Sequence, residues 1–210
     1  MRTMVGIILG VGLTAAPALG QSLVPAPTFG MLDVCLEVST GFVLPESAAT
    51  VMLREADTIW QPYGVRLRRL TGDEGACDRR ILIKDGAEAP PGEEAVASAL
   101  GWVPFVAGRA RRLVYLRLAR TRSQIAAMSR GSRPEGLNLH LMAKFLGRGL
   151  AHEIGHILLN SRDHAPRGLM RARFQPTDVL DTPLATYSLT RAEQVQIFGA
   201  PTLIAQRESR

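Results

Sequence analysis

The sequence of 210 residues predicts one domain of mixed α+β class. Segments with alternating apolar residues, typical of strands, are interleaved with segments in which apolar residues recur every three or four positions, typical of helices. The chain is 46% apolar and 21% charged, which supports a buried core and excludes disorder as the main state. The length suits a single core and excludes an assembly of several domains.

The N-terminal segment, residues 1–20, is predicted to be a secretory signal peptide. Arg2 supplies a positive charge, residues 4–16 are apolar and uncharged, and small residues end the segment, as signal peptidases require. The apolar run is short for a membrane-spanning helix, and an uncleaved anchor is the alternative. A short leader with two prolines follows at residues 21–31, so we expect a single folded domain over residues 32–210 and no integral membrane segment after cleavage.

The first half of the domain is predicted to hold five strands and one helix. Within the segment 45–60, apolar residues recur at helical spacing, and Pro45 stands where a helix begins. The alternating segments that predict strands are residues 32–38, 65–70, 80–84, 95–105 and 112–118.

The second half is predicted to be mainly helix and loop. Residues 119–136 read as a loop with one helical turn, and residues 137–159 as a long helix interrupted by Gly147 and Gly149. A loop is expected up to residue 188. Thr190 and Glu193 then have the spacing of a capping box, which opens a final helix.

The charge of the chain is a weak functional signal. The net charge is +6 and the pI is about 10.1, which permits an anionic partner without requiring one. A run of arginines favours solvated strand edges over contact with anionic envelope polymers: Arg109, Arg111, Arg112, Arg117, Arg120 and Arg122. A nucleic-acid partner is disfavoured by the signal peptide and by an aromatic content of 5%.

The two cysteines, Cys35 and Cys77, both lie in the predicted mature chain. An even pair in an oxidising compartment predicts a disulfide, and two free thiols are the alternative. The spacing typical of cysteine metal ligands is absent from the sequence, so neither cysteine is expected to bind a metal.

Residues 152–156 read His-Glu-Ile-Gly-His and carry the main chemical signal. Four residues apart on a helix, His152 and His156 point to the same side and can bind one zinc ion together. Glu153 can then act as the general base toward a water molecule that the zinc activates. The pattern predicts a zinc-dependent hydrolytic site.

A third protein ligand is required to complete such a site. The segment between Glu153 and Glu193 contains no glutamate, so the neighbouring candidates are His164 and Asp163. His164 is preferred, because its imidazole would complete a neutral site of three histidines.

The segment from His152 to Met170 resembles the zinc-binding signature of the metzincin metalloproteases, HExxHxxGxxH followed by a turn that contains methionine. His164 lies eight residues after His156 instead of six, and Leu159 stands where the signature has glycine. Asn160 can supply the left-handed conformation one position later. The resemblance is closest to a bacterial secreted matrixin-like group.

The resemblance implies a metzincin-like zincin fold, with a mixed twisted sheet, an N-terminal helix, an active-site helix and a C-terminal helix. It implies Zn²⁺ as the cofactor, and Met170 as a hydrophobic floor that does not bind the metal. It also implies that a peptide substrate lies along an edge strand, which makes Leu100 and Gly101 the expected backbone contacts. Trp102 is interpreted as a half-buried packing residue.

Three other residues are expected to have no role in the site. His140 is interpreted as a surface or packing residue, Arg148 as part of a solvated helix face, and Tyr187 as a packing aromatic.

Two functions follow as hypotheses. The first is a secreted (periplasmic or extracellular) zinc endopeptidase that acts on protein or peptide substrates, with Glu153 as general base. The alternative is a catalytically inactive zincin-fold protein that binds anionic envelope components. The intact Glu153 argues against the alternative, since a structural zinc site does not need a general base.

Overall fold

The computed structural model describes residues 31–71, 76–92, 99–129, 134–175 and 177–199. The predicted signal peptide lies outside these residues, as do residues 21–30 of the predicted leader and residues 200–210 of the predicted domain. The division of the chain into these segments therefore stays a prediction.

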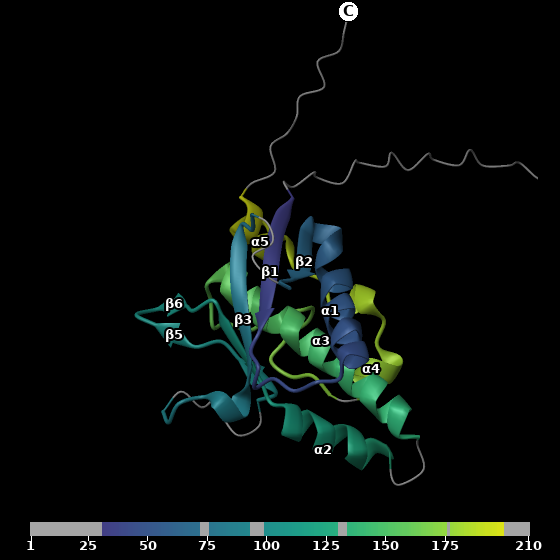
Figure 1. Cartoon of the computed structure of the whole chain (residues 1–210). Helices are drawn as coiled ribbons and strands as arrows, with labels where there is room; N and C mark the ends of the chain where they lie inside the picture. The colour runs from purple at the N-terminus through teal and green to yellow at the C-terminus, as the bar shows by residue number, and fades with distance from the viewer. Residues whose placement is uncertain (1–30, 72–75, 93–98, 130–133, 176, 200–210) are drawn as a thin grey trace, which may run out of the picture.

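A twisted sheet of five strands forms the centre of the molecule (Figure 1). Its strands are β1 (Leu32–Val38), β2 (Val65–Arg69), β3 (Arg79–Asp85), β4 (Gly101–Trp102) and β7 (Leu113–Leu116). They are ordered β2-β1-β3-β7-β4. The first four in this order pair in parallel, and β4 pairs antiparallel to β7 at the edge.

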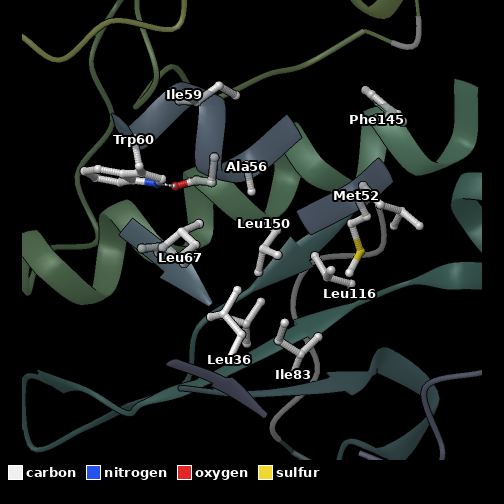
Figure 2. Packing of buried hydrophobic residues seen from close by; sticks show 14 of the residues in the cluster. Leu36, Met52, Ala56, Ile59, Trp60, Leu67, Ile83, Leu116, Phe145 and Leu150 are labelled. Atoms are coloured by element: carbon white, nitrogen blue, oxygen red, sulfur yellow. Dashed lines mark hydrogen bonds between the residues drawn. The ribbon is translucent and has the colours of Figure 1, made fainter. Parts of the chain in front are cut away.

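Two long helices cover one face of the sheet (Figure 1): α1 (Glu46–Trp60) and α3 (Glu135–Leu159). The strands turn alternate apolar side chains to these helices, and Leu36 and Ile83 meet Leu150 in the core (Figure 2). The two helices also share a polar link in this core, because Trp60 Nε1 donates a hydrogen bond of 3.1 Å to the Ala151 carbonyl (Figure 2). The helix that carries the histidine motif is thus held by both α1 and the sheet.

Shorter elements complete the described part of the chain. They are the 3-10 turns η1 (Gln61–Tyr63), η2 (Gly86–Glu88) and η3 (Leu184–Thr186), the hairpin strands β5 (Phe105–Val106) and β6 (Arg109–Ala110), and the helices α2 (Leu118–Ser129), α4 (Asp178–Asp181) and α5 (Arg191–Phe198).

This architecture confirms the predicted α+β class, with a mixed sheet, an N-terminal helix, a long helix that carries the histidine motif and a C-terminal helix. The capping box is present, because the Thr190 side chain accepts a hydrogen bond from the Glu193 amide and the Glu193 side chain accepts one from the Thr190 amide.

Three predicted elements are wrong in extent. Residues 118–129 form a full helix, not a loop with one turn. The long helix continues without interruption through Gly147 and Gly149. Of the strand predicted at 95–105, the described residues keep only Gly101–Trp102, because the chain then enters the β5–β6 hairpin.

Cys35 and Cys77 form a disulfide that links β1 to the segment before β3. The pairing is the one predicted. In the described part of the chain, no helix is both long and apolar enough to cross a membrane.

Candidate metal centre

One stripe of helix α3 faces a cavity of about 600 Å³. Its members recur at helical spacing and all line the cavity: Phe145, Gly149, His152, Glu153 and His156. The opposite wall includes the edge strand β4. The helix therefore presents both histidines and the glutamate of the motif to one open cavity.

Backbone carbonyl groups fix the orientation of the first two imidazoles. His152 Nδ1 lies 2.8 Å from the Leu169 carbonyl oxygen, and His156 Nδ1 lies 2.7 Å from that of Ser161. A carbonyl only accepts, so each Nδ1 carries the proton and each Nε2 keeps its lone pair. The two Nε2 atoms converge to 3.1 Å.

A turn at the end of α3 brings His164 to the same point. Asn160 adopts the left-handed conformation (φ 48°, ψ 40°), as its place beside the missing glycine predicts. The His164 ring stacks on His152 at 5.3 Å between centroids and meets His156 edge-on at 4.9 Å. The ligand atoms of the three histidines all lie within 4.8 Å of one another.

Asp163, the alternative third ligand, points to a different partner. Its Oδ2 accepts a 2.9 Å hydrogen bond from the Ser161 hydroxyl. The structure places His164, not Asp163, in the cluster with His152 and His156.

The histidine cluster fits a zinc ion. Zinc–nitrogen bonds of about 2.0–2.1 Å at tetrahedral angles separate the ligand atoms by about 3.4 Å. Here the Nε2 atoms of His152 and His156 are 3.1 Å apart, and the ligand atoms of all three histidines lie within 4.8 Å of one another. Burial lowers the pKa of His152 to about 3 and also lowers the pKa of His156 and His164. The imidazoles are therefore neutral at pH 7, which is the form that binds a metal.

Glu153 lies beside the edge strand. A Cβ atom at Gly101 would stand 3.2 Å from Glu153 Cγ, so the glycine permits this close approach. The carboxyl is buried, and burial raises its pKa to about 8. Without a cation nearby this carboxyl is therefore largely protonated at pH 7, and an adjacent cation would favour its ionised form.

Met170 lies beneath the motif and is 1% exposed. Its Sδ atom occupies the place that a side chain at Gly155 would need, so the glycine of the motif allows the methionine to pack against the helix. The Met170 carbonyl accepts a 2.8 Å hydrogen bond from the Ala165 amide, which closes the loop that carries His164. This packing position agrees with the predicted hydrophobic floor.

The expected substrate contacts, Leu100 and Gly101, both line the cavity. Gly101 pairs with Leu116 of β7, and the described residues place no strand on the other edge of β4. Trp102 is half-buried and stacks on Tyr115 at 4.8 Å, as expected of a packing aromatic.

Two arginines do not lie where they were predicted: Arg120, expected on a solvated strand edge, is part of helix α2 and lines the cavity, and Arg148, expected on a solvated helix face, is buried. It is 4% exposed, and its Nε donates to Glu55 Oε1 of α1 at 2.7 Å. Its Nη1 donates to the Tyr187 hydroxyl at 3.0 Å and to the Asp178 carbonyl at 2.6 Å. The available signal was Glu55, an acid within the apolar stripe of its helix, since a buried carboxylate requires a partner.

The other two residues lie where they were expected. Tyr187 is buried and packs parallel to Phe174 at 5.6 Å, and Phe174 in turn meets His152 edge-on at 5.1 Å. His140 is exposed and lies outside the histidine cluster.

Comparison with known proteins shows a similarity to solved structures. No protein-family model matches the chain, and no curated protein matches it. Archaemetzincin from Methanopyrus kandleri is similar with a TM-score of 0.43 and 14% sequence identity, over 80% of this chain and 93% of that chain. At this identity and TM-score the likeness supports no functional inference.

Proposed function

We propose that the chain is a secreted zinc-dependent endopeptidase that resembles the matrixin-like metzincins. The observation that carries the proposal is the convergence of three neutral imidazoles with Glu153 on the wall of one cavity. An edge strand borders the same cavity. A structural zinc site is usually closed by a fourth protein ligand, whereas a catalytic one keeps a position open.

His152, His156 and His164 hold the zinc ion in this proposal. Bound zinc polarises a carbonyl group and lowers the pKa of a water molecule to about 7. Glu153 accepts the proton of the attacking water and passes it to the departing amine. Burial raises the pKa of this carboxyl to about 8 in the metal-free chain, and the positive charge of a bound zinc ion would lower it again, which favours the ionised form that accepts the proton.

The edge strand β4 supplies a place for an extended peptide. Arg117 N donates a 2.8 Å hydrogen bond to the Leu100 carbonyl, and this bond together with the pairing of Gly101 and Leu116 occupies the inner side of the strand. The outer edge can pair with the main chain of a substrate. We therefore assign Leu100 and Gly101 to substrate binding.

Secretion is supported by the disulfide between Cys35 and Cys77, because such bonds persist in oxidising compartments. The signal peptide stays a prediction from sequence.

The metal ligands are tested by the zinc content of the purified mature protein and of a His164→Ala variant. We expect one zinc per chain in the parent and weakened binding in the variant. His140→Ala is the matched control, since that histidine is exposed and lies outside the cluster. Zinc binding unchanged by His164→Ala would assign the third ligand to Asp163 or another group.

The mechanism is tested by Glu153→Ala. We expect this variant to keep its zinc and to lose peptide hydrolysis by a factor of about 10² to 10⁴, the usual contribution of a general base. Retained hydrolysis would contradict the assigned role. A zinc-loaded parent that cleaves no peptide would favour the non-catalytic binding protein.

A further inference from the structure

The cavity extends beyond the histidines along α3 toward α2. Arg120 and Gln124 stand four residues apart on α2 and line the cavity together with Phe145 and Gly149 of α3. Phe145 and Gly149 precede His152 by two turns and one turn of the helix on the same stripe. We call these four residues the side pocket.

The side pocket contains buried polar atoms without a protein partner. Arg120 Nε and Gln124 Oε1 are both buried, and neither has a hydrogen-bond partner in the described part of the chain. Leaving such groups unpaired is unfavourable, and most buried polar atoms have partners. These two atoms therefore indicate a ligand that supplies the missing hydrogen bonds.

The charges around the cavity favour an anion. The described lining residues include the arginines Arg120, Arg162 and Arg173, and Glu153 is the one acidic residue among them. Glu153 is already assigned to the proton transfers. Guanidinium groups match carboxylates in both charge and geometry. Gln124 Oε1 is an acceptor, as a carboxylate is, so the Gln124 amide must turn over and place its NH2 group at this position to donate to the same carboxylate.

The side pocket also has room for a side chain. A Cβ atom built on Gly149 meets no other atom within 4 Å, so the glycine leaves this part of the cavity open. Phe145 is buried and offers an apolar wall to methylene groups. A short apolar stem that ends in a carboxylate satisfies these features together.

We propose that the side pocket binds a carboxylate of the peptide substrate, held by Arg120. The proposal rests on the endopeptidase function proposed above and adds its substrate class. Two sources share this chemistry: the side chain of an Asp or Glu residue near the cleaved bond, and the free C-terminal carboxylate of a short peptide.

The test uses matched peptides that carry Glu, Gln or Lys at one position near the cleaved bond, each with a free or an amidated C-terminus. The parent, Arg120→Gln and Arg122→Gln proteins are compared by kcat/KM. Arg122 is the matched control, because it is an exposed arginine of the same helix outside the cavity.

We expect the parent and Arg122→Gln to prefer one carboxylate by about tenfold or more over its uncharged counterpart, as a charged hydrogen bond implies. Arg120→Gln should lose that preference through a higher KM while keeping its zinc. A preference for Glu over Gln identifies the side chain as the source, and a preference for the free over the amidated terminus identifies the C-terminal carboxylate.

A second variant tests whether the open space of the side pocket is needed in addition to the charge of Arg120. Gly149→Leu keeps Arg120 and extends a side chain into the open space, so it should also abolish the preference. Equal cleavage of charged and uncharged peptides by the parent, or equal loss of the preference in Arg120→Gln and Arg122→Gln, would overturn the proposal.

Peptide binding to the Glu153→Ala variant, measured by fluorescence anisotropy, does not depend on catalysis. If the acidic peptide binds more tightly than the uncharged one, and Arg120→Gln removes this difference, the side pocket is supported. This holds even if the parent hydrolyses no peptide, and in that case only the endopeptidase function fails. Equal binding of the acidic and uncharged peptides would overturn the carboxylate proposal itself.

Discussion

Tyr187 connects the buried Arg148 to the first histidine of the candidate metal centre. Its hydroxyl accepts a hydrogen bond from Arg148 Nη1 at 3.0 Å, and its ring stacks on Phe174, which packs against His152. Burial raises the pKa of the phenol, so the ring stays neutral in the folded protein. His152 is thus supported by consecutive contacts that run from Arg148, buried between α1 and α3, through Tyr187 and Phe174.

Replacing Tyr187 by Phe tests this support. The ring stack is kept, and the hydrogen bonds that the hydroxyl accepts from Arg148 at 3.0 Å and from Arg171 at 3.4 Å are lost. We therefore expect Tyr187→Phe to lower the free energy of unfolding by about 1–2 kcal/mol at pH 7. Chemical denaturation measures this change, and zinc content should be unaffected. A loss of zinc in this variant would show that the hydroxyl itself orients the metal site.

The stability difference between the parent and Tyr187→Phe should depend on pH. The folded-state pKa of Tyr187 lies above that of the unfolded chain, which is about 10. The contribution of the protonated phenol is therefore complete below pH 10 and is lost as the pH rises above it. We expect the difference in unfolding free energy between parent and Tyr187→Phe to shrink above pH 10, and a constant difference would contradict the assignment.

The site residues differ in how far sequence could predict them. His152 and His156 were predictable because four-residue spacing on a helix alone places them on one face. Glu153 was predictable from its place in the pattern, directly after the first histidine. His164 needed the left-handed turn at Asn160, which asparagine favours enough to be expected. Arg148 was not predictable from its own helix, because its burial depends on Glu55 of another element.

At the scale of elements, helix α3 uses its glycines for different purposes. A Cβ atom at Gly147 would lie 2.5 Å from the Met52 carbonyl oxygen, so this glycine permits the close packing of α1 on α3. A Cβ atom at Gly149 would meet only open space. Both were expected to interrupt the helix, yet packing against α1 overrides their low helix propensity.

These two glycines make a matched pair of substitutions. Gly147→Ala should lower the free energy of unfolding by about 1–3 kcal/mol, because overpacking outweighs the gain in helix propensity. Gly149→Ala should raise it by about 0.5–1 kcal/mol. Thermal or denaturant unfolding of both variants measures the two changes, and changes of the same sign would contradict the assigned contacts.

Helix α2 was predicted as a loop with one helical turn because of one polar residue on its buried side. Its buried positions Leu118, Thr121 and Ile125 have helical spacing, but Thr121 places a polar residue in the middle of the apolar stripe. The Thr121 hydroxyl donates a 3.0 Å hydrogen bond to the Arg117 carbonyl, so burying the threonine costs little free energy. Sequence shows the polarity of the residue, but the hydrogen bond is visible only in the fold.

At the scale of the whole molecule, the disulfide links β1 to a segment 42 residues away, across α1 and β2. Closing a loop of this length is worth roughly 4 kcal/mol in the chain-entropy model. We expect the Cys35→Ser, Cys77→Ser double variant to lose about that much unfolding free energy while the cavity residues keep their zinc. An unfolding free energy equal to that of the parent would show that the sheet fixes this segment without the bond.

Zinc should also contribute to the stability of the whole domain, because its ligands come from two parts of the chain. His152 and His156 belong to α3, whereas His164 belongs to the following loop. That loop holds Met170 against Gly155, and its Leu169 amide donates a 2.9 Å hydrogen bond to the Ser188 carbonyl. An ion that binds only the folded chain joins these segments and raises stability by mass action.

The expected gain is about 4 kcal/mol when free zinc exceeds its Kd a thousandfold, which corresponds to a rise in Tm of roughly 10 °C for a domain of this size. Calorimetry with zinc and with a chelator measures the rise in the parent, in His164→Ala and in the control His140→Ala. The control should match the parent, and His164→Ala should show a much smaller rise because one of the two joined segments no longer binds the ion. An equal rise in all three proteins would mean that zinc stabilises α3 alone, with the loop held in place by Met170 and the Leu169–Ser188 hydrogen bond.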